Sequence, residues 1–256
     1  MSSFNKKEWL KYIPEKDNRV DGYIFDESGI LNVNKPSGIS SMDVLRVIKR
    51  NGQVRKAGHG GTLDPLASGV LPVLINKATR ISGDYLGSEK SYDGVLNLGC
   101  EYDTQDITGK PVGEPKEVTR EISLEEMNDV AAKFIGTIEQ LPPIYSALKK
   151  GGRPLYDYAR KGEDVLREAR TVTVMEFQIT DKISNSSFSF YVKCQKGVYV
   201  RTLVHDLGNV LGYGGAIASL RRLSVGPLSL DNSVDLDLLQ SSDDIRKYLM
   251  PLPDSL

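Results

Sequence analysis

The stretch GHGGTLDPLASGV, residues 58–70, is the part of this chain from which its fold and function can best be inferred. It contains four glycines, one of the two histidines of the chain, and an aspartate, Asp64, directly before Pro65. A proline disfavours the helical conformation of the preceding residue, and glycines allow tight turns and close approach of a ligand to the main chain. The pattern predicts a carboxylate held in a fixed orientation on a loop. A purely structural turn, in which Asp64 caps its own backbone, fits the same residues.

Several other kinds of site fit this sequence poorly. A P-loop requires a lysine and a hydroxyl residue after its glycines, and a dinucleotide-binding fingerprint requires a third glycine where Leu63 stands. A serine-hydrolase elbow, Gly-x-Ser-x-Gly, does not occur. His59 and His205 are far apart in the sequence, and neither Cys100 nor Cys194 belongs to a Cys-x-x-Cys pair. We therefore expect no metal and no cofactor.

Composition places the chain among ordinary globular proteins. It has 256 residues, of which 39% are hydrophobic and 26% charged, and its net charge is −1. No apolar run approaches the roughly 20 residues that span a bilayer, and the N-terminus lacks the apolar centre of a secretory signal. We expect a cytoplasmic monomer that does not contact membranes, with residues 1–28 as an N-terminal extension.

Hydrophobic patterning predicts an α+β fold in which helices and strands do not alternate regularly. Strands are expected at 29–38, 70–75, 90–104, 171–180 and 187–195. Helices are expected at 40–50, 123–136 and 198–212. In the helix at 123–136, Ser123 and Glu126 have the spacing of a capping box, and Gly136 is expected to end it.

The segment from 137 to 170 is basic and is interrupted by prolines and glycines. Its tyrosines, Tyr145, Tyr156 and Tyr158, could stack on bases or pack the segment itself. Because scattered surface charge is common, a solvated surface explains the composition as well as a nucleic-acid contact does.

Several motifs together resemble the TruB family of RNA pseudouridine synthases. GHGGTLDPLASGVLPV resembles its catalytic segment, with glycine at position 60 where threonine or serine is common. Further segments match in the same order: LNVNKPSGISSMDVL, KSYDGVLNLGCEYDTQDITG, LPPIYSALKKGGRPLYDYARKGEDVLREARTVTV, KGVYVRTLVHDLG and LRRL. The resemblance covers about residues 29–230.

The resemblance implies a pseudouridine synthase fold, a mixed and mostly antiparallel sheet flanked by helices. It implies one catalytic domain at 29–256, an inserted RNA-gripping segment at about 137–170, and no complete C-terminal PUA domain. The implied activity converts uridine to pseudouridine at position 55 in the T loop of tRNA. The base is flipped out, detached from ribose at N1 and reattached through C5. The implied partner is the T arm of tRNA.

Three catalytic residues follow from the resemblance. Asp64 corresponds to the catalytic carboxylate, which must be ionised. Tyr92 corresponds to the tyrosine that stacks on the target base, although its strand face also carries two leucines and could belong to the core. Arg201 corresponds to an arginine whose guanidinium favours the ionised carboxylate; without the motif it could be a surface helix charge.

A second set of residues is implied to bind substrate or shape the pocket. His59 corresponds to a histidine that fills the space left by extruded nucleotides. Lys35, Pro36 and Leu220 correspond to residues of the active-site wall. The basic residues of the gripping segment are implied to meet phosphates. The set is His59, Lys35, Pro36, Gly61, Leu220, Lys149, Lys150 and Arg153. A plain core role explains Leu220 equally well.

Two rival functions use the same binding residues. One is a guide-dependent synthase of the Cbf5/dyskerin type, which the long gripping segment disfavours. The other is a tRNA-folding chaperone whose catalysis is dispensable. A chaperone does not require the pair Asp64 and Arg201.

Overall fold

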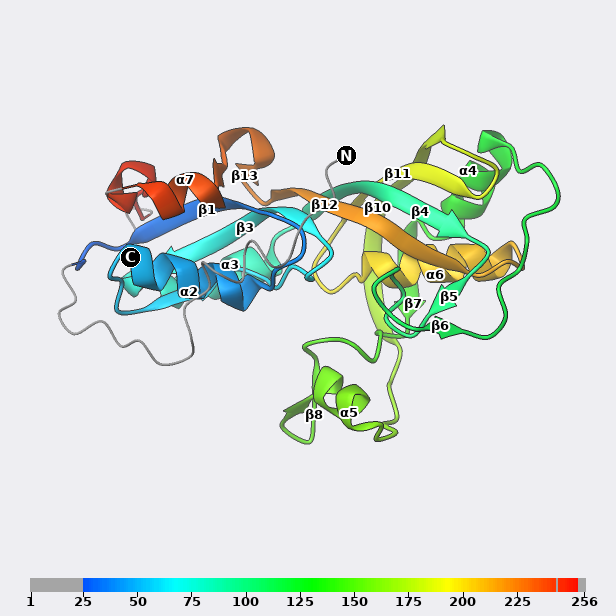
Figure 1. Cartoon of the computed structure of the whole chain (residues 1–256), viewed down its shortest axis with the longest axis horizontal. Helices are drawn as coiled ribbons and strands as arrows, with labels where there is room; N and C mark the ends of the chain where they lie inside the picture. Colours follow the sequence, from blue (N-terminus) through cyan, green and yellow to red (C-terminus); the bar gives the residue numbers. More distant parts are fainter. Residues whose placement is uncertain (1–24, 243, 253–256) are drawn as a thin grey trace. The chain divides into compact units, whose positions relative to one another are not determined.

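The structure is a computed structural model that describes residues 25–242 and 244–252. The chain forms two compact units (Figure 1). Unit 1 combines the chain up to Lys90 with the chain from Arg221 onward, and unit 2 comprises Ser91–Leu220. Two strands, β4 and β12, contribute residues to both units because the boundaries fall within them.

The strands of unit 1 form a mixed sheet in the order β14, β1, β3, β12. β1 pairs antiparallel with β3 along its whole length, whereas β14 pairs with β1 and β12 with β3 in parallel. β2 and β13 add short antiparallel pairings to β3 and β12. The strands are β1 (Gly29–Lys35), β2 (Ala57–His59), β3 (Ser68–Ile75), β12 (Gly215–Val225), β13 (Leu228–Ser229) and β14 (Val234–Asp235).

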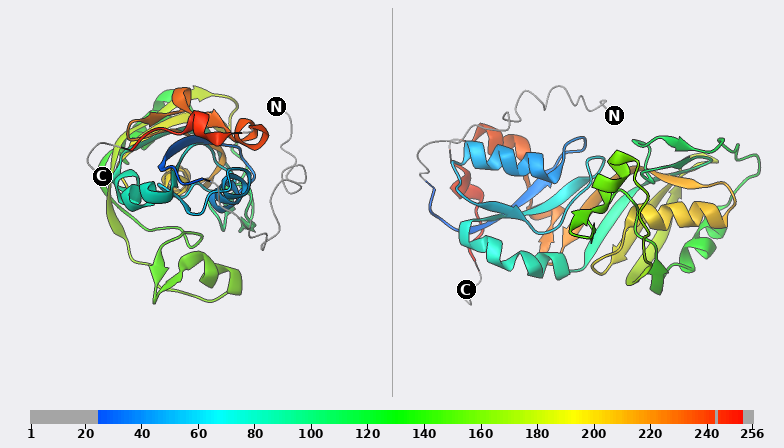
Figure 2. Two further views of the ribbon diagram at one scale, coloured as in Figure 1. Left: turned by 90° about the vertical axis from the view of Figure 1, so that its left-hand side faces the viewer. Right: turned by 90° about the horizontal axis from the view of Figure 1, so that it is seen from below.

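Short helices complete unit 1, and α2 packs beside β2 and α7 (Figure 2). They are α2 (Ser41–Asn51), η1 (Asn76–Ile81), α3 (Ser82–Gly87), η2 (Leu230–Asn232), α7 (Leu236–Ser241) and η3 (Ile245–Tyr248). α2 begins with a complete capping box between Ser40 and Asp43, which confirms the predicted helix start. A cluster of buried side chains that includes Ile30, Leu74 and Leu228 forms the core.

The strands of unit 2 follow the order β12, β4, β11, β10, β7, and the pairs of β10 with β11 and β7 are antiparallel. The strands are β4 (Lys90–Leu98), β5 (Glu101–Tyr102), β6 (Pro111–Val112), β7 (Gly136–Gln140), β8 (Lys149–Lys150), β9 (Arg153–Pro154), β10 (Arg170–Lys182) and β11 (Ser187–Cys194). The helices are α4 (Leu124–Ala132), α5 (Leu155–Lys161) and α6 (Val200–Val210). Together the two units confirm the predicted α+β fold with a mixed sheet.

Helix α4 differs from its prediction at both ends. The hydroxyl of Ser123 accepts from the main-chain N–H of Glu126, but the Glu126 carboxylate pairs with Arg120. The helix ends at Ala132, earlier than predicted, and Gly136 begins β7 with a φ of +97°. Glycine at this position permits the left-handed turn into the strand.

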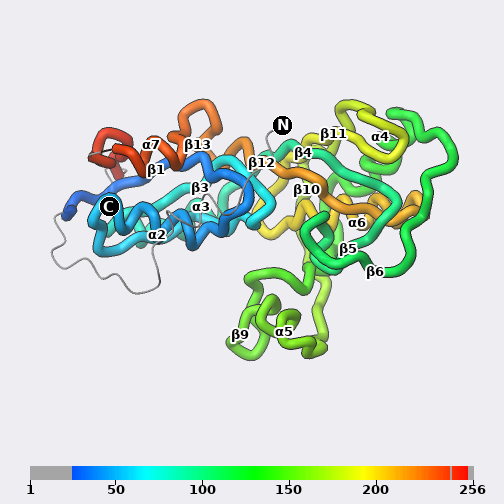
Figure 3. The backbone as a smooth tube through the Cα atoms, in the orientation of Figure 1, coloured from blue at the N-terminus to red at the C-terminus, as the bar shows by residue number. Residues whose placement is uncertain are grey.

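The segment predicted to grip RNA forms a small lobe within unit 2. It contains the two-stranded pair β8–β9 followed by α5, which ends at Gly162 in the left-handed conformation. Figure 3 shows the chain leaving the strands of unit 2 for this lobe and returning beside its own exit.

Candidate active site

The Asp64 loop connects β2 to β3, and residues of the KPSGISS motif hold its main chain. The Ser41 hydroxyl donates to the carbonyl of Leu63 at 2.9 Å and accepts from the N–H of Leu63 at 2.9 Å. The Ser37 hydroxyl donates to the carbonyl of Leu66 at 2.6 Å. These contacts flank Asp64 on both sides, so the backbone that carries the carboxylate is fixed by neighbouring side chains. The predicted anchored loop is thus present.

Arg222, from β12, holds the same loop from another element. Its guanidinium donates to the carbonyls of Val70 at 2.7 Å, Gly61 at 3.2 Å and Thr62 at 3.3 Å. The side chain is 1% exposed. Arg222 lies in the LRRL motif but is not among the site residues that the sequence predicts. Arginine is rarely fully buried, so its identity alone gives no signal of this role.

Lys35 ends β1 and is fully buried. Its Nζ donates to the carbonyls of Pro36 at 2.8 Å and Ile39 at 2.7 Å. Burial lowers the pKa of Lys35 to about 7, and the nearby charge of Asp64 opposes this shift. A neutral amine still has two hydrogens, so it can satisfy both carbonyls. Lys35 therefore holds the turn at 36–39, and within this turn the N–H of Gly38 donates to the carbonyl of Pro65 at 2.6 Å.

His59 lies at the end of β2, where the loop begins. Burial lowers its pKa, and the charge of Arg222 adds to the effect, so the imidazole is neutral at neutral pH. Its buried Nδ1 has no hydrogen-bond partner in the described chain. Gly61, two residues later, has a φ of +129°, a backbone conformation that a larger residue rarely adopts.

Arg201 belongs to unit 2 and is buried at the start of α6, so it is not a surface helix charge. Its guanidinium donates to the carbonyls of Thr104 at 2.6 Å and Tyr145 at 2.9 Å. The carboxylate of Asp106 lies 3.9 Å from its Nη1. The arginine thereby joins the turn at 103–108 to the start of the segment that was predicted to grip RNA.

Tyr92 and Leu220 are buried in unit 2, on β4 and β12. Tyr92 is 8% exposed and shares the buried character of Leu96 and Leu98, as the alternation of the strand predicts. The predicted residues thus fall into groups. Lys35, Pro36, His59, Gly61 and Asp64 gather around one loop of unit 1, whereas Tyr92, Arg201 and Leu220 belong to unit 2.

The basic residues of the lobe differ in their surroundings. The guanidinium of Arg153 forms an ion pair with Glu163 and lies 3.5 Å from the centre of the Tyr158 ring. Lys150 donates to the carbonyl of Leu166 at 2.6 Å, and its Nζ is 3.6 Å from the carboxylate of Glu168. Internal partners therefore engage both charges, and Tyr158 packs the lobe.

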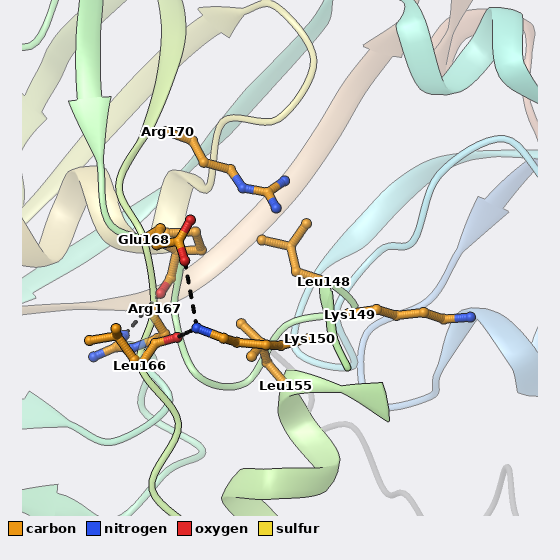
Figure 4. A pocket seen from close by; sticks show the side chains of 9 residues that line it. Leu148, Lys149, Lys150, Leu155, Leu166, Arg167, Glu168 and Arg170 are labelled. Atoms are coloured by element: carbon orange, nitrogen blue, oxygen red, sulfur yellow. Dashed lines mark hydrogen bonds and ion pairs between the residues drawn. The ribbon is translucent and has the colours of Figure 1, made fainter. Parts of the chain in front are cut away.

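Lys149 is exposed and points away from Lys150 beside a pocket of about 140 Å³ (Figure 4). Arg170 lines the same pocket and is also exposed. In the described chain neither side chain has a hydrogen bond or an ion pair with a protein group. These two cations are therefore available to an external anion.

Within residues 25–242 and 244–252, no group of three or more His, Cys, Asp and Glu side chains is placed to hold a metal ion. The helices of the same residues are all too short or too polar to cross a bilayer.

Two family models match this chain. Residues 49–200 match the TruB family pseudouridylate synthase N-terminal domain, and residues 201–256 match the tRNA pseudouridylate synthase B C-terminal domain. The tRNA pseudouridine synthase B of Burkholderia pseudomallei (strain 668) is 45% identical over 216 residues, which cover 84% of this chain and 70% of the relative. The tRNA pseudouridine synthase B of Bordetella parapertussis is 42% identical over 224 residues, which cover 88% of this chain and 91% of the relative.

Solved structures of Cbf5 complexes share the fold. A Cbf5-Nop10-Gar1 complex has a TM-score of 0.66 at 29% identity, covering 87% of this chain and 60% of the solved one. An archaeal box H/ACA Nop10-Cbf5 complex has a TM-score of 0.62 at 29% identity, covering 86% of this chain and 55% of the solved one. The present chain thus spans less than two thirds of each of these solved chains.

The fold and the matched domains define a pseudouridine synthase, an enzyme that isomerises uridine within RNA. The chain belongs to the TruB family of pseudouridylate synthases. The family that the motifs around Asp64 indicated is therefore confirmed.

Proposed function

We propose that this protein converts uridine to pseudouridine at position 55 in the T loop of tRNA, without a guide RNA. The observation that carries the proposal is the anchored loop, in which Ser37, Ser41 and Arg222 fix the backbone on both sides of Asp64. An aspartate presented on a rigid loop suits a reaction that requires one accurately placed carboxylate. Relatives that are 42–45% identical and are named tRNA pseudouridine synthase B support tRNA as the substrate.

The reaction breaks the bond between C1′ and N1 of the uridine and forms a bond between C1′ and C5. In net balance one proton leaves C5 and one is gained at N1, so no oxidant and no group donor is required. We assign Asp64 as the carboxylate of this reaction, acting in its ionised form. A carboxylate can serve as a nucleophile or as a base in such chemistry.

The target uridine must leave its stack before it can react, at a cost of a few kcal/mol. We assign Tyr92 to stack on the flipped base and to assist removal of the C5 proton. His59 is assigned to fill space between displaced nucleotides, because its lowered pKa keeps it uncharged there. Arg201 is assigned to favour the ionised carboxylate, and Leu220 to the apolar wall of the pocket.

Phosphates of the T arm are the proposed ligands of the lobe. Lys149 supports this assignment because it is exposed beside the pocket in Figure 4. Lys150 and Arg153 already have internal partners, so we expect their contribution to tRNA affinity to be smaller than that of Lys149.

The proposal is tested by replacing the carboxylate of Asp64 with an amide of the same shape. Asp64→Asn should abolish tritium release from tRNA labelled at C5 of uridine, while tRNA binding stays within about three-fold of wild type. Asp26→Asn is the matched control, because Asp26 is exposed and its change removes the same charge from the same unit. We expect Asp26→Asn to retain the full rate.

Other results of the same assay would favour one of the two rival functions. Release by Asp64→Asn at the wild-type rate would show that another group performs the chemistry. Release that requires an added guide RNA would favour the guide-dependent class, which the likeness to Cbf5 complexes makes a specific alternative. Tight tRNA binding by wild type with no release under any condition would favour a folding chaperone.

A further inference from the structure

Arg222 is a buried cation with an unusual set of partners. Its guanidinium hydrogen bonds within the described chain all go to main-chain carbonyls, and none goes to a carboxylate. Removing a charge from water is costly unless strong hydrogen bonds compensate for the lost hydration. A neutral core residue would avoid this cost, so the presence of arginine here calls for a role beyond filling space.

The three carbonyls lie on both arms of the Asp64 loop. Gly61 and Thr62 precede Asp64, whereas Val70 follows it at the start of the buried part of β3. One rigid guanidinium therefore ties together the two ends of the segment that presents the carboxylate. A lysine ammonium lacks the planar fork of donors that here reaches three carbonyls at once.

The backbone geometry brings Arg222 to this position. β12 pairs in parallel with β3, with Arg222 opposite Gly69. A Cβ on Gly69 would lie 2.2 Å from the Arg222 carbonyl oxygen, and the φ of Gly69 is +101°. Glycine at 69 is thus required for the two chains to approach closely enough for the guanidinium to reach inside the loop.

We propose that Arg222 is a positioning residue that sets the location of the Asp64 carboxylate by holding the two arms of its loop together. This inference rests on the proposed function for its link to catalysis. It assigns Arg222 no contact with substrate. Misplacement of a reacting group by about 1 Å can cost on the order of 100-fold in rate, so a loosened loop should be visible in the chemical step.

The main test is Arg222→Lys, which keeps the positive charge but cannot reach all three carbonyls. We expect the single-turnover rate of pseudouridine formation at saturating enzyme to fall about 100-fold, with the Kd for tRNA within about three-fold of wild type. Amide hydrogen exchange should accelerate across residues 60–70. Leu228→Ala is the control for lost stability, because Leu228 is a core residue of the same unit that lies on β13, outside the Asp64 loop. It should lower the Tm without changing the rate.

A second variant, Arg222→Gln, guards against a folding defect. It removes the buried charge, and with it the desolvation cost, while keeping an amide that can reach one carbonyl. We expect the same loss of rate with retained tRNA binding. A rate within about three-fold of wild type in either folded variant, or unchanged exchange at 60–70, would overturn the inference. If wild type forms no pseudouridine, the proposed function fails, and the exchange measurement alone decides whether Arg222 holds the loop.

Discussion

At the scale of single residues, two buried basic side chains, Arg222 and Lys35, lie around the loop that carries Asp64. The Arg222 guanidinium donates to three carbonyls of the loop. Lys35, by contrast, has a pKa lowered by burial to about 7, so it is partly neutral under ordinary conditions. The charge of Asp64 raises the pKa of Lys35 and thus limits this effect. The loop is thus held by one guanidinium and lies near a lysine that titrates close to neutral pH.

This arrangement predicts how stability depends on pH. The pKa of Lys35 is about 7 in the folded protein against a reference value of 10.5. Between these values the unfolded chain holds the proton and the folded chain does not. Stability therefore rises with pH across this window, and the cost of burying the charge is fully present below it. Lys35→Met should flatten the rise.

Urea unfolding of both proteins at about pH 7 and about pH 9.5 measures this difference, because other titrating groups cancel when the two proteins are compared. The wild type should gain more free energy of unfolding over this interval than Lys35→Met. Equal gains in the two proteins would show that Lys35 remains charged in the folded state.

At the scale of elements, alternation and capping signals predicted the three longest helices and five of the longer strands, but none of the short elements. The buried side of β11, with Phe188 and Phe190, follows directly from its period-two pattern. β12 was not predicted, because paired arginines interrupt its apolar pattern and one of them, Arg222, turns inward. Burial of that arginine depends on carbonyls supplied by residues far away in the sequence, which a local pattern cannot reveal.

The candidate site shows the same limit. The motifs identified Asp64 and the Lys-Pro pair, because these residue types carry the chemistry or the turn. Ser37 and Ser41 lie in the KPSGISS motif, but the motif does not predict that their hydroxyls anchor the loop, because their partners are main-chain groups more than 20 residues away. Arg153 was expected to meet phosphate, yet Glu163 and Tyr158 already engage its guanidinium.

In the lobe, we expect Lys149 and Arg153 to contribute differently to the salt dependence of tRNA binding. Lys149→Ala should reduce the slope of log affinity for tRNA against log salt concentration by about one unit, because one phosphate contact is lost. Arg153→Ala should leave the slope nearly unchanged, since its charge is already paired, and should loosen the lobe instead.

Filter-binding titrations of tRNA over a range of salt concentrations provide both slopes. Proteolysis at 145–170 reports the loosening expected for Arg153→Ala. If Arg153→Ala alone reduced the slope, the ion pair with Glu163 would have to open on RNA binding, and the assignment of the two residues would be reversed.

At the scale of the whole molecule, the chain carries two matched domains of a single enzyme family. Its likeness to Cbf5 complexes shows that the fold also occurs in proteins solved together with other subunits. Membership of the family therefore establishes the reaction class, whereas the choice of RNA and of nucleotide is the part that we propose.

The most direct measurement is nucleotide-resolution mapping of pseudouridine in an unmodified, full-length tRNA transcript after incubation with the purified protein alone. We expect a single pseudouridine, at position 55, and none when Asp64→Asn replaces the wild type. Modification at a different uridine, modification only after a guide RNA is added, or product formed by Asp64→Asn would contradict it.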